Sequence, residues 1–223
     1  MGKVAERVEA FLGEYAAGKS ELAVNRALAC LGQGEQVTLV DLDLVEPTYT
    51  LRPLRSRLTE LGLTVVAWST EETTGLGEAG MTLNPAAKSA LRRPGTVILD
   101  VGYGPYGSSV LNLIDGAWGH PQLEQHLVIN TARPLTSSVD LIIEEAARFQ
   151  GLTDLINNTH LGHETTVSDV ERGAEVVSAA ADKLGIPMLA SCALEELAAE
   201  IGPLDSVGCL IWPLHRYMQD AFW

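Results

Sequence analysis

The stretch GEYAAGKS, Gly13–Ser20, follows a short apolar run and precedes an apolar pattern with helical spacing. It satisfies the pattern G-x-x-x-x-G-K-[ST] in full, through Gly13, Gly18, Lys19 and Ser20. In such a loop the backbone N–H groups surround a phosphate, the glycines permit its close approach, and the helix N-terminus that follows adds a favourable dipole. We therefore expect Lys19 to reach the β- and γ-phosphates and the Ser20 hydroxyl to bind magnesium. The alternative is an ordinary strand–turn–helix without a ligand.

Short apolar or β-branched runs alternate with helical patterns along the rest of the chain, which predicts an α/β protein with a mainly parallel central sheet and helices on both faces. The expected strands are Val8–Leu12, Gln36–Asp43, Leu63–Trp68, Thr96–Val101, His126–Asn130, Leu152–Asn157 and Pro187–Ser191. The expected helices are the one after Ser20, Leu51–Leu61, Ser137–Phe149 and Val167–Leu184. Gly75–Gly80 and Gly102–Gly107 are expected to be glycine-rich loops too short to separate domains, so we expect residues 1–223 to form a single domain.

The charge balance excludes several classes of partner. The formal net charge of the 223 residues is −14, whereas sequence-independent binding to nucleic acid or to an anionic membrane needs a basic surface. The N-terminal run carries charges and no apolar run is long enough to span a bilayer, so we expect a cytoplasmic protein. The cysteines Cys30, Cys192 and Cys209 have no CxxC spacing, and we expect small buried side chains in a reducing compartment.

Carboxylates follow the predicted strands at the edge where ligands bind in such sheets. Asp100 ends a buried apolar run and precedes a glycine turn, as expected of an aspartate that holds magnesium through water. Asp41 and Asp43 end an earlier strand and, because side chains alternate, point to one face. Two carboxylates there suit a metal and the orientation of an attacking water. The alternatives are a strand-end cap for Asp100 and a helix cap before Leu51 for the pair.

These stretches together resemble the MinD/ParA/CobQ group of phosphate-loop proteins, which belongs to the SIMIBI class. The resemblance rests on GEYAAGKSELAVNRAL, VTLVDLDLVEP, VILDVGYG and LINNTHLG, and it extends from about Val8 to about Leu184. More narrowly, the chain is similar to bacterial proteins described only as ATP-binding or MinD-like. Those proteins share a GEYGSGKTE-like loop, a VDLDIVNP-like strand end and a GLINNTNLGEETT-like segment. The resemblance implies a P-loop nucleotide-binding fold.

By position, the resemblance implies a set of site residues. Lys19 and Asp43 are the implied catalytic residues, with Asp43 orienting water, and Ser20, Asp41 and Asp100 lie near magnesium. The implied nucleotide-binding residues are Gly13, Glu14, Tyr15, Ala16, Ala17, Gly18, Lys19, Ser20, Glu21 and Asn158. An amide at Asn158 can donate and accept, which suits the mixed edge of adenine. A guanine-reading N-K-x-D is absent from this segment of the sequence, so we expect ATP rather than GTP.

One residue departs from the group's pattern. MinD/ParA proteins carry a lysine just after the first glycine of the loop, and it reaches the partner's nucleotide across a homodimer, whereas this chain has Glu14. A carboxylate would repel developing phosphate charge, so we expect slow hydrolysis or a need for a partner. The arginines Arg52, Arg55 and Arg57 could supply the missing cation, and a solvated helix face is the competing interpretation.

Smaller features allow more than one interpretation. His160 and His163, which lie beside Glu164, could hold a metal, although no third ligand is apparent and the segment already has a base-binding interpretation. Arg133, with the proline after it, could contact nucleotide or a partner, or could cap the sheet edge. Near the C-terminus a helical face is expected, which suits docking on the chain's own domain or a dimer partner better than a membrane. Its members are Leu214, Tyr217, Met218, Ala221 and Phe222.

Two functions of different kinds fit these residues best. The first is a nucleotide switch, a slow magnesium-dependent ATPase whose loops order on ATP binding and act on an unknown protein partner. The second is a substrate-directed phosphoryl-transfer enzyme like the dethiobiotin synthetase and cobyrinate amidoligase relatives of this fold. A non-hydrolysing binding module is a third. A metal-cluster carrier is disfavoured because the cysteines lack paired spacing.

Overall fold

The computed structural model describes residues 4–44, 51–73 and 82–218 of the 223-residue chain. The chain forms two compact units, of which unit 1 holds Met1–Leu12 and Ser20–Glu124 and unit 2 holds Gly13–Lys19 and Gln125–Trp223. Both are built from parallel strands and helices, so the predicted α/β class is confirmed. The expectation of a single domain stays a prediction.

The sheet of unit 1 is parallel throughout, with strand order β3-β2-β4-β1. Its strands are β1 (Arg7–Leu12), β2 (Val37–Leu42), β3 (Thr64–Val66) and β4 (Thr96–Val101). Strands β2 and β4 are buried along their whole length. Burial on both faces explains why the sequences of these strands are nearly continuous apolar runs rather than alternating patterns.

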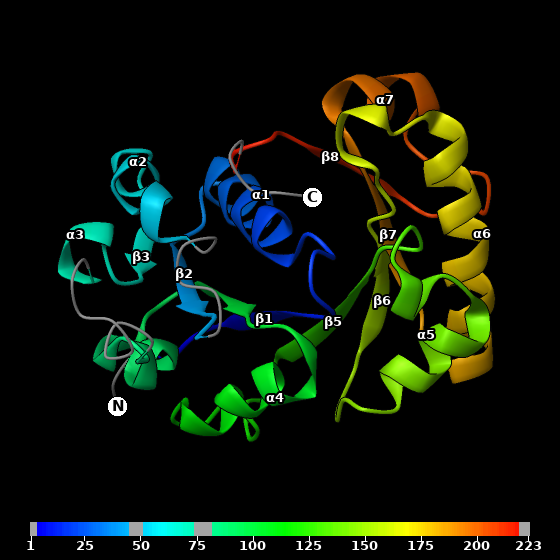
Figure 1. Ribbon diagram of the computed structural model, residues 1–223. Coiled ribbons are helices and arrows are strands. Elements are labelled where there is room, and N and C mark those ends of the chain that lie inside the picture. The colour runs from blue at the N-terminus through cyan, green and yellow to red at the C-terminus, as the bar shows by residue number, and fades with distance from the viewer. Residues whose placement is uncertain (1–3, 45–50, 74–81, 219–223) are drawn as a thin grey trace. The chain divides into compact units, whose positions relative to one another are not determined.

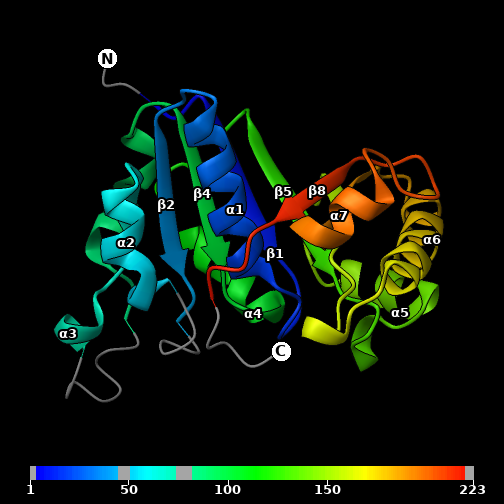
Figure 2. The same cartoon turned by 90° about the horizontal axis from the view of Figure 1, so that it is seen from above.

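Helices lie on both faces of this sheet, with α1 on one side of β1 and β2 and α4 on the other (Figure 1). Seen from above, α1 runs alongside β4 and β1 (Figure 2). The helices of this part of the chain are α1 (Lys19–Gly32), α2 (Arg55–Glu60), α3 (Thr70–Thr73), α4 (Gly104–Ser108) and the 3-10 segments η1 (Arg52–Leu54), η3 (Pro85–Arg92) and η4 (Ser109–Leu113).

Unit 2 has a second run of parallel strands in the order β5-β6-β7-β8. They are β5 (Leu123–Ile129), β6 (Asp154–Asn157), β7 (Met188–Leu194) and β8 (Ile211–Leu214). The accompanying helices are α5 (Val139–Ala146), α6 (Val167–Leu184), α7 (Glu195–Ile201) and the 3-10 turns η5 (Pro134–Thr136) and η6 (Gly162–Glu164). A capping box between Thr166 and Asp169 begins α6, and Gly185 ends it in the left-handed conformation.

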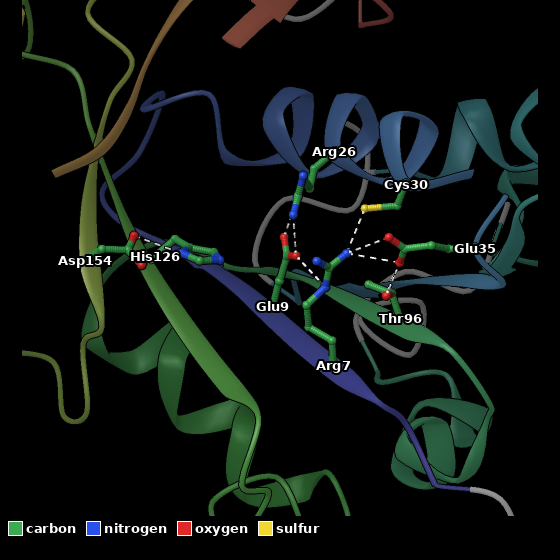
Figure 3. Close-up of polar contacts among 8 residues, drawn as sticks. All are labelled: Arg7, Glu9, Arg26, Cys30, Glu35, Thr96, His126 and Asp154. Carbon is green, nitrogen blue, oxygen red and sulfur yellow. Dashed lines mark hydrogen bonds and ion pairs between the residues drawn. The ribbon is translucent and has the colours of Figure 1, made fainter. Parts of the chain in front are cut away.

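A buried ion network fixes α1 against β1 within unit 1 (Figure 3). The carboxylate of Glu9, on β1, is 1% exposed and receives two hydrogen bonds from Arg26 of α1, at 2.8 and 2.9 Å. Arg7 pairs with Glu9 at 3.1 Å and with Glu35, beyond the end of α1, at 3.0 Å. Removing one member would leave buried charge unpaired, so the network holds the helix in one position on the sheet.

A second buried pair lies in unit 2, where His126 of β5 and Asp154 of β6 are register partners (Figure 3). Their Nδ1–Oδ distances are 2.8 and 2.9 Å. Cys30 and Cys192 are buried and Cys209 is half-buried, and burial raises the pKa of each thiol. This matches small, unreactive side chains. Within the described residues, no helix is both long enough and apolar enough to cross a bilayer.

The predicted strands are all present, and the predicted bounds of β4 and α6 are those observed. Two expectations are corrected. Most of the predicted loop Gly102–Gly107 lies in α4, and the other predicted loop, Gly75–Gly80, lies outside the described residues. Leu214 lies in β8 rather than on a helix, and His215–Met218 is not helical, while Ala221 and Phe222 lie outside the described residues. Strand β8 escapes sequence analysis because it contains Pro213, which the last strand of the unit 2 order tolerates.

Candidate nucleotide-binding site

The two glycines of the motif occupy positions that no other residue fits. Gly13 has φ 140° and a Cβ there would lie 2.6 Å from the Val128 carbonyl oxygen. Gly18 has φ 86° and its Cβ would lie 2.2 Å from the Asn158 amide nitrogen. Both backbone conformations are left-handed or strained for L-residues, and both spaces are already filled. The glycines therefore let the loop pass directly over β5 and the end of β6.

The loop between these glycines is closed by its own lysine. Lys19 is 7% exposed, and its Nζ donates to the Glu14 carbonyl oxygen at 2.9 Å. The same carbonyl accepts from the Ala17 N–H at 3.3 Å. Ala16 has φ 54°, which is costly for a residue with a side chain and is typical of functional loops. The cation is thus held over a ring of backbone, where a phosphate oxygen could replace the carbonyl as its acceptor.

The side chain of Glu14 is held on one side by residues that the sequence did not single out, while its Oε2 accepts from the Tyr15 N–H of the loop at 3.4 Å. Arg148 Nη1 lies 3.1 Å from Glu14 Oε1 and 2.5 Å from Glu145 Oε2. Glu145 stands in the last turn of α5 and Arg148 just after it. Burial, and next the charge of Glu14, raises the pKa of Glu145. The ion pair with Arg148 offsets part of the repulsion that the sequence predicts between Glu14 and phosphate.

Asn158 supports the loop from the end of β6. It is 4% exposed, its side-chain amide donates to the Ala17 carbonyl at 2.7 Å, and its backbone N–H donates to the Ile129 carbonyl at 2.7 Å. An asparagine amide has a second N–H and an oxygen with which to meet a base. The sequence assigned only base recognition to Asn158, and the structure adds a direct bond to the phosphate loop.

His160 lies next to the same loop and is neutral at pH 7. A Cβ on Gly18 would lie 3.6 Å from its Nε2. Burial, followed by the charges of Arg133 and Arg216, lowers the pKa of His160 to about 4. Arg216 Nη1 also donates to His163 Nε2. Because the Arg216 guanidinium donates to Nε2 of His163, this nitrogen is not open to a metal. The contact therefore disfavours the metal site considered for His160 and His163.

The predicted metal-binding carboxylates come together in unit 1. Asp41 of β2 and Asp100 of β4 are register partners and are 6% and 0% exposed. Asp43 follows β2, and its N–H donates to Asp41 Oδ1 at 3.1 Å. Ser20 and the buried Glu21 stand in the first turn of α1. Two adjacent buried carboxylates are electrostatically costly unless a cation compensates them.

The turn after β4 is packed tightly beside Asp43. A Cβ on Gly102 would lie 3.1 Å from Asp43 Oδ1, and one on Gly107 would lie 2.1 Å from the Gly102 carbonyl oxygen. Helix α4 therefore folds back over the strand end at Gly107. At Gly107 only a residue without a side chain permits this approach, whereas a Cβ on Gly102 would push the Asp43 carboxylate aside by a few tenths of an ångström.

These residues fit a magnesium ion better than a metal bound by protein alone. Among the described residues no group of three or more His, Cys, Asp or Glu side chains could hold a metal. Magnesium in nucleotide sites is usually bound through one or two carboxylates or hydroxyls, with phosphates and waters completing the octahedron. The Ser20 hydroxyl would be a ligand of that kind, Asp41 and Asp100 would hold the ion through its waters, and the nucleotide would have to supply the rest.

The arginines proposed as substitutes for the missing lysine differ in their surroundings. Arg55 pairs with Glu72 at 2.6 Å, Arg57 is exposed, and Arg52 is buried. The ion pair of Arg55 and the exposure of Arg57 agree with the interpretation of a solvated helix face. Arg52, by its burial, does not fit that interpretation.

No known family profile and no curated protein sequence matches the chain. Its structure is similar to the cell division protein FtsY of Thermotoga maritima, with TM-score 0.50 and 18% identity over 85% of this chain and 63% of that one. It is also similar to the signal recognition particle receptor FtsY of Elizabethkingia anophelis in complex with GDP, with TM-score 0.53 and 14% identity over 82% and 56% of the two chains. These likenesses show that the chain has the α/β fold of P-loop NTPases.

The chain spans about three fifths of the length of the solved structures that it matches. The predicted fold class is confirmed by them. At these identities the likenesses show the fold alone. The MinD/ParA branch, the bound base and the role of each residue stay predictions.

The contact between Asn158 and the loop leads to a prediction about the variant Asn158→Ala. Loss of the hydrogen bond to Ala17 should weaken binding of magnesium–pyrophosphate, which has no base, by about tenfold, or about 1–1.5 kcal/mol. Calorimetric titration with pyrophosphate and with ATP measures the two effects separately. The additional loss for ATP reports contact with the base. Unchanged pyrophosphate binding would show that Asn158 does not support the loop.

Proposed function

We propose that this chain binds a magnesium–nucleoside triphosphate at Gly13–Ser20 and acts as a nucleotide-dependent switch. The observation that carries the proposal is the geometry of the loop. Its glycines bring the backbone into positions open only to glycine, and Lys19 is already held across it on the Glu14 carbonyl. A bound phosphate would accept from Lys19 and from backbone N–H groups at the start of α1, where the helix dipole favours negative charge.

The metal proposal rests on the buried carboxylates of unit 1. Ser20 follows Lys19 directly in α1, so a magnesium ligand is joined to the phosphate-binding residues by the chain itself. Asp100 and Asp41 would hold magnesium through its waters, as their adjacent positions on β4 and β2 suit. Bound magnesium would neutralise phosphate charge. The protein residues would orient it, and the nucleotide oxygens would complete its coordination.

Adenine is the base that we propose, on the chemistry of the segment after β6. Guanine presents N–H groups that a carboxylate normally receives, as in N-K-x-D. Here the segment is Asn157, Asn158, Thr159 and His160, and His160 is neutral at pH 7. Amide and imidazole groups can both donate and accept, which suits adenine. The FtsY of E. anophelis binds GDP, so GTP is the competing nucleotide.

The central test of nucleotide binding is Lys19→Ala. Removing one charge-assisted contact to phosphate should weaken magnesium–ATP binding by roughly 2–4 kcal/mol. Lys88→Ala is the matched control because Lys88 is exposed and lies far along the chain from the loop. Calorimetry with ATP and GTP measures both affinity and base preference. Equal ATP affinity for Lys19→Ala and wild type would show that the loop does not hold phosphate.

Hydrolysis is proposed to be slow, with Asp43 orienting the attacking water. Glu14 stands where MinD/ParA proteins carry the lysine that acts in trans, and a missing trans cation costs roughly 10³–10⁵ in rate in arginine-finger systems. Asp43→Asn should lower the basal phosphate release rate further and leave ATP affinity unchanged, because Asp43 acts on water. Fast basal turnover, or unchanged turnover in Asp43→Asn, would contradict this role.

A substrate-directed enzyme is the second candidate. Arg133 and Arg216 both lie close enough to His160 to lower its pKa, so positive charge gathers beside the proposed base-binding segment. An acidic small molecule would be attracted there. This candidate predicts ATP turnover that needs a carboxylic acid substrate, whereas the switch predicts turnover that responds to a protein partner or a second copy of the chain. Turnover measured with a panel of small acids separates the two.

A further inference from the structure

The position of Glu14 sets the position of the phosphate-binding lysine. The backbone carbonyl oxygen of Glu14 accepts hydrogen bonds from Lys19 Nζ, at 2.9 Å, and from the Ala17 N–H. Any rotation of the Glu14 peptide would move this acceptor and the lysine with it. The side chain of Glu14 is therefore a means of fixing the loop from outside.

That side chain is held by a cluster that we call the latch, made of Glu14, Glu145 and Arg148. One guanidinium lies between two carboxylates, at 3.1 Å from Glu14 and 2.5 Å from Glu145. The carboxylate side chains are 12% and 3% exposed, whereas that of Arg148 is 46% exposed. Two poorly hydrated carboxylates share one cation, so the cluster carries an excess of negative charge unless it also holds a proton.

We propose that Glu145 and Arg148 are positioning residues for the phosphate loop, which hold Glu14 and through it the acceptor of Lys19. The inference rests on the proposed nucleotide binding at this loop. Neither residue needs to touch the nucleotide. Arg148 supplies the charge that orients Glu14, and Glu145 fixes Arg148 from the last turn of α5.

The latch also makes nucleotide binding depend on protons. The charged groups that act on Glu145 are Glu14 from the loop and Arg148, which follows α5. Helix α6 packs against α5 and forms an ion pair with it between Lys183 and Asp140, and neither of these residues is among the groups that shift the pKa of Glu145. Burial and Glu14 raise the pKa of Glu145, so the folded protein binds a proton more tightly there than the unfolded chain does. Phosphate in the adjacent loop adds negative charge and should raise this pKa further, so nucleotide binding takes up a proton from solvent.

The sign of the pH dependence follows from the raised pKa. The stabilising contribution of protonated Glu145 is complete below its ordinary value of 4.5 and is lost as pH rises through the raised value. Nucleotide affinity should fall at higher pH, as pH rises from the raised pKa of the free protein to the still higher pKa of the complex, because binding favours the protonated cluster. Glu145→Gln keeps the shape and the acceptor for Arg148 but removes the proton equilibrium. Both pH dependences should therefore be lost in this variant.

The experiment compares Glu145→Gln and Arg148→Met with the controls Glu144→Gln and Arg172→Met. Glu144 is the exposed neighbour of Glu145, and Arg172 makes an exposed ion pair with a residue of its own helix. Calorimetry with magnesium and a non-hydrolysable ATP analogue, in buffers of different ionisation enthalpy, gives affinity and proton uptake. Wild type and both controls should take up protons, Glu145→Gln should not, and Arg148→Met should bind about tenfold more weakly.

Two measurements without nucleotide separate this inference from the proposed function. Hydrogen exchange of the amides from Tyr15 to Lys19 should be faster in Arg148→Met than in wild type and both controls. Thermal stability of wild type should fall with rising pH relative to Glu145→Gln. If wild type binds neither ATP nor GTP analogues, the proposed function is wrong and these two measurements decide whether the latch exists. Unchanged exchange in Arg148→Met, or proton uptake retained in Glu145→Gln, would overturn the latch.

Discussion

The close approach of the phosphate loop to the strand ends of unit 2 is the constraint on which the proposed site depends. Gly13 passes over Val128 and Gly18 passes over Asn158, at distances that leave no room for a Cβ. A side chain at either position would lift the loop from β5 and β6 and break the bond from Asn158 to Ala17. The same approach brings Lys19 across the loop to the Glu14 carbonyl, so the lysine is placed before any ligand binds.

Around this loop the chain places positive charge against an acidic background. The formal net charge is −14, yet unit 2 holds several cations close to the loop. Lys19 belongs to the loop, Arg148 pairs with Glu14, and Arg133 and Arg216 lie near His160. In unit 1, by contrast, the strand ends carry the buried carboxylates Asp41 and Asp100. Phosphate chemistry calls for both kinds of group, cations that meet the phosphates and carboxylates that hold magnesium through water.

The sequence predicts the regular secondary structure of this protein and misses the features that depend on contacts between residues far apart in the sequence. The position of the motif between β1 and α1, the buried strand β4 and the long helix α6 follow from local patterns and appear as predicted. Strand β8 is hidden by its proline. The latch is hidden for another reason, since Arg148 lies 134 residues from Glu14 and an E-x-x-R spacing on a helix normally signals only a surface ion pair. The supporting bond from Asn158 to Ala17 spans 141 residues and has no local pattern either.

A structure of the protein with magnesium and a non-hydrolysable ATP analogue tests the central claim most directly. The account predicts that phosphate oxygens accept hydrogen bonds from the backbone between Gly13 and Ser20. It also predicts that Lys19 Nζ leaves the Glu14 carbonyl for a phosphate, and that the Ser20 hydroxyl binds magnesium. Phosphates bound elsewhere, or a lysine that stays on Glu14 with nucleotide present, would contradict it.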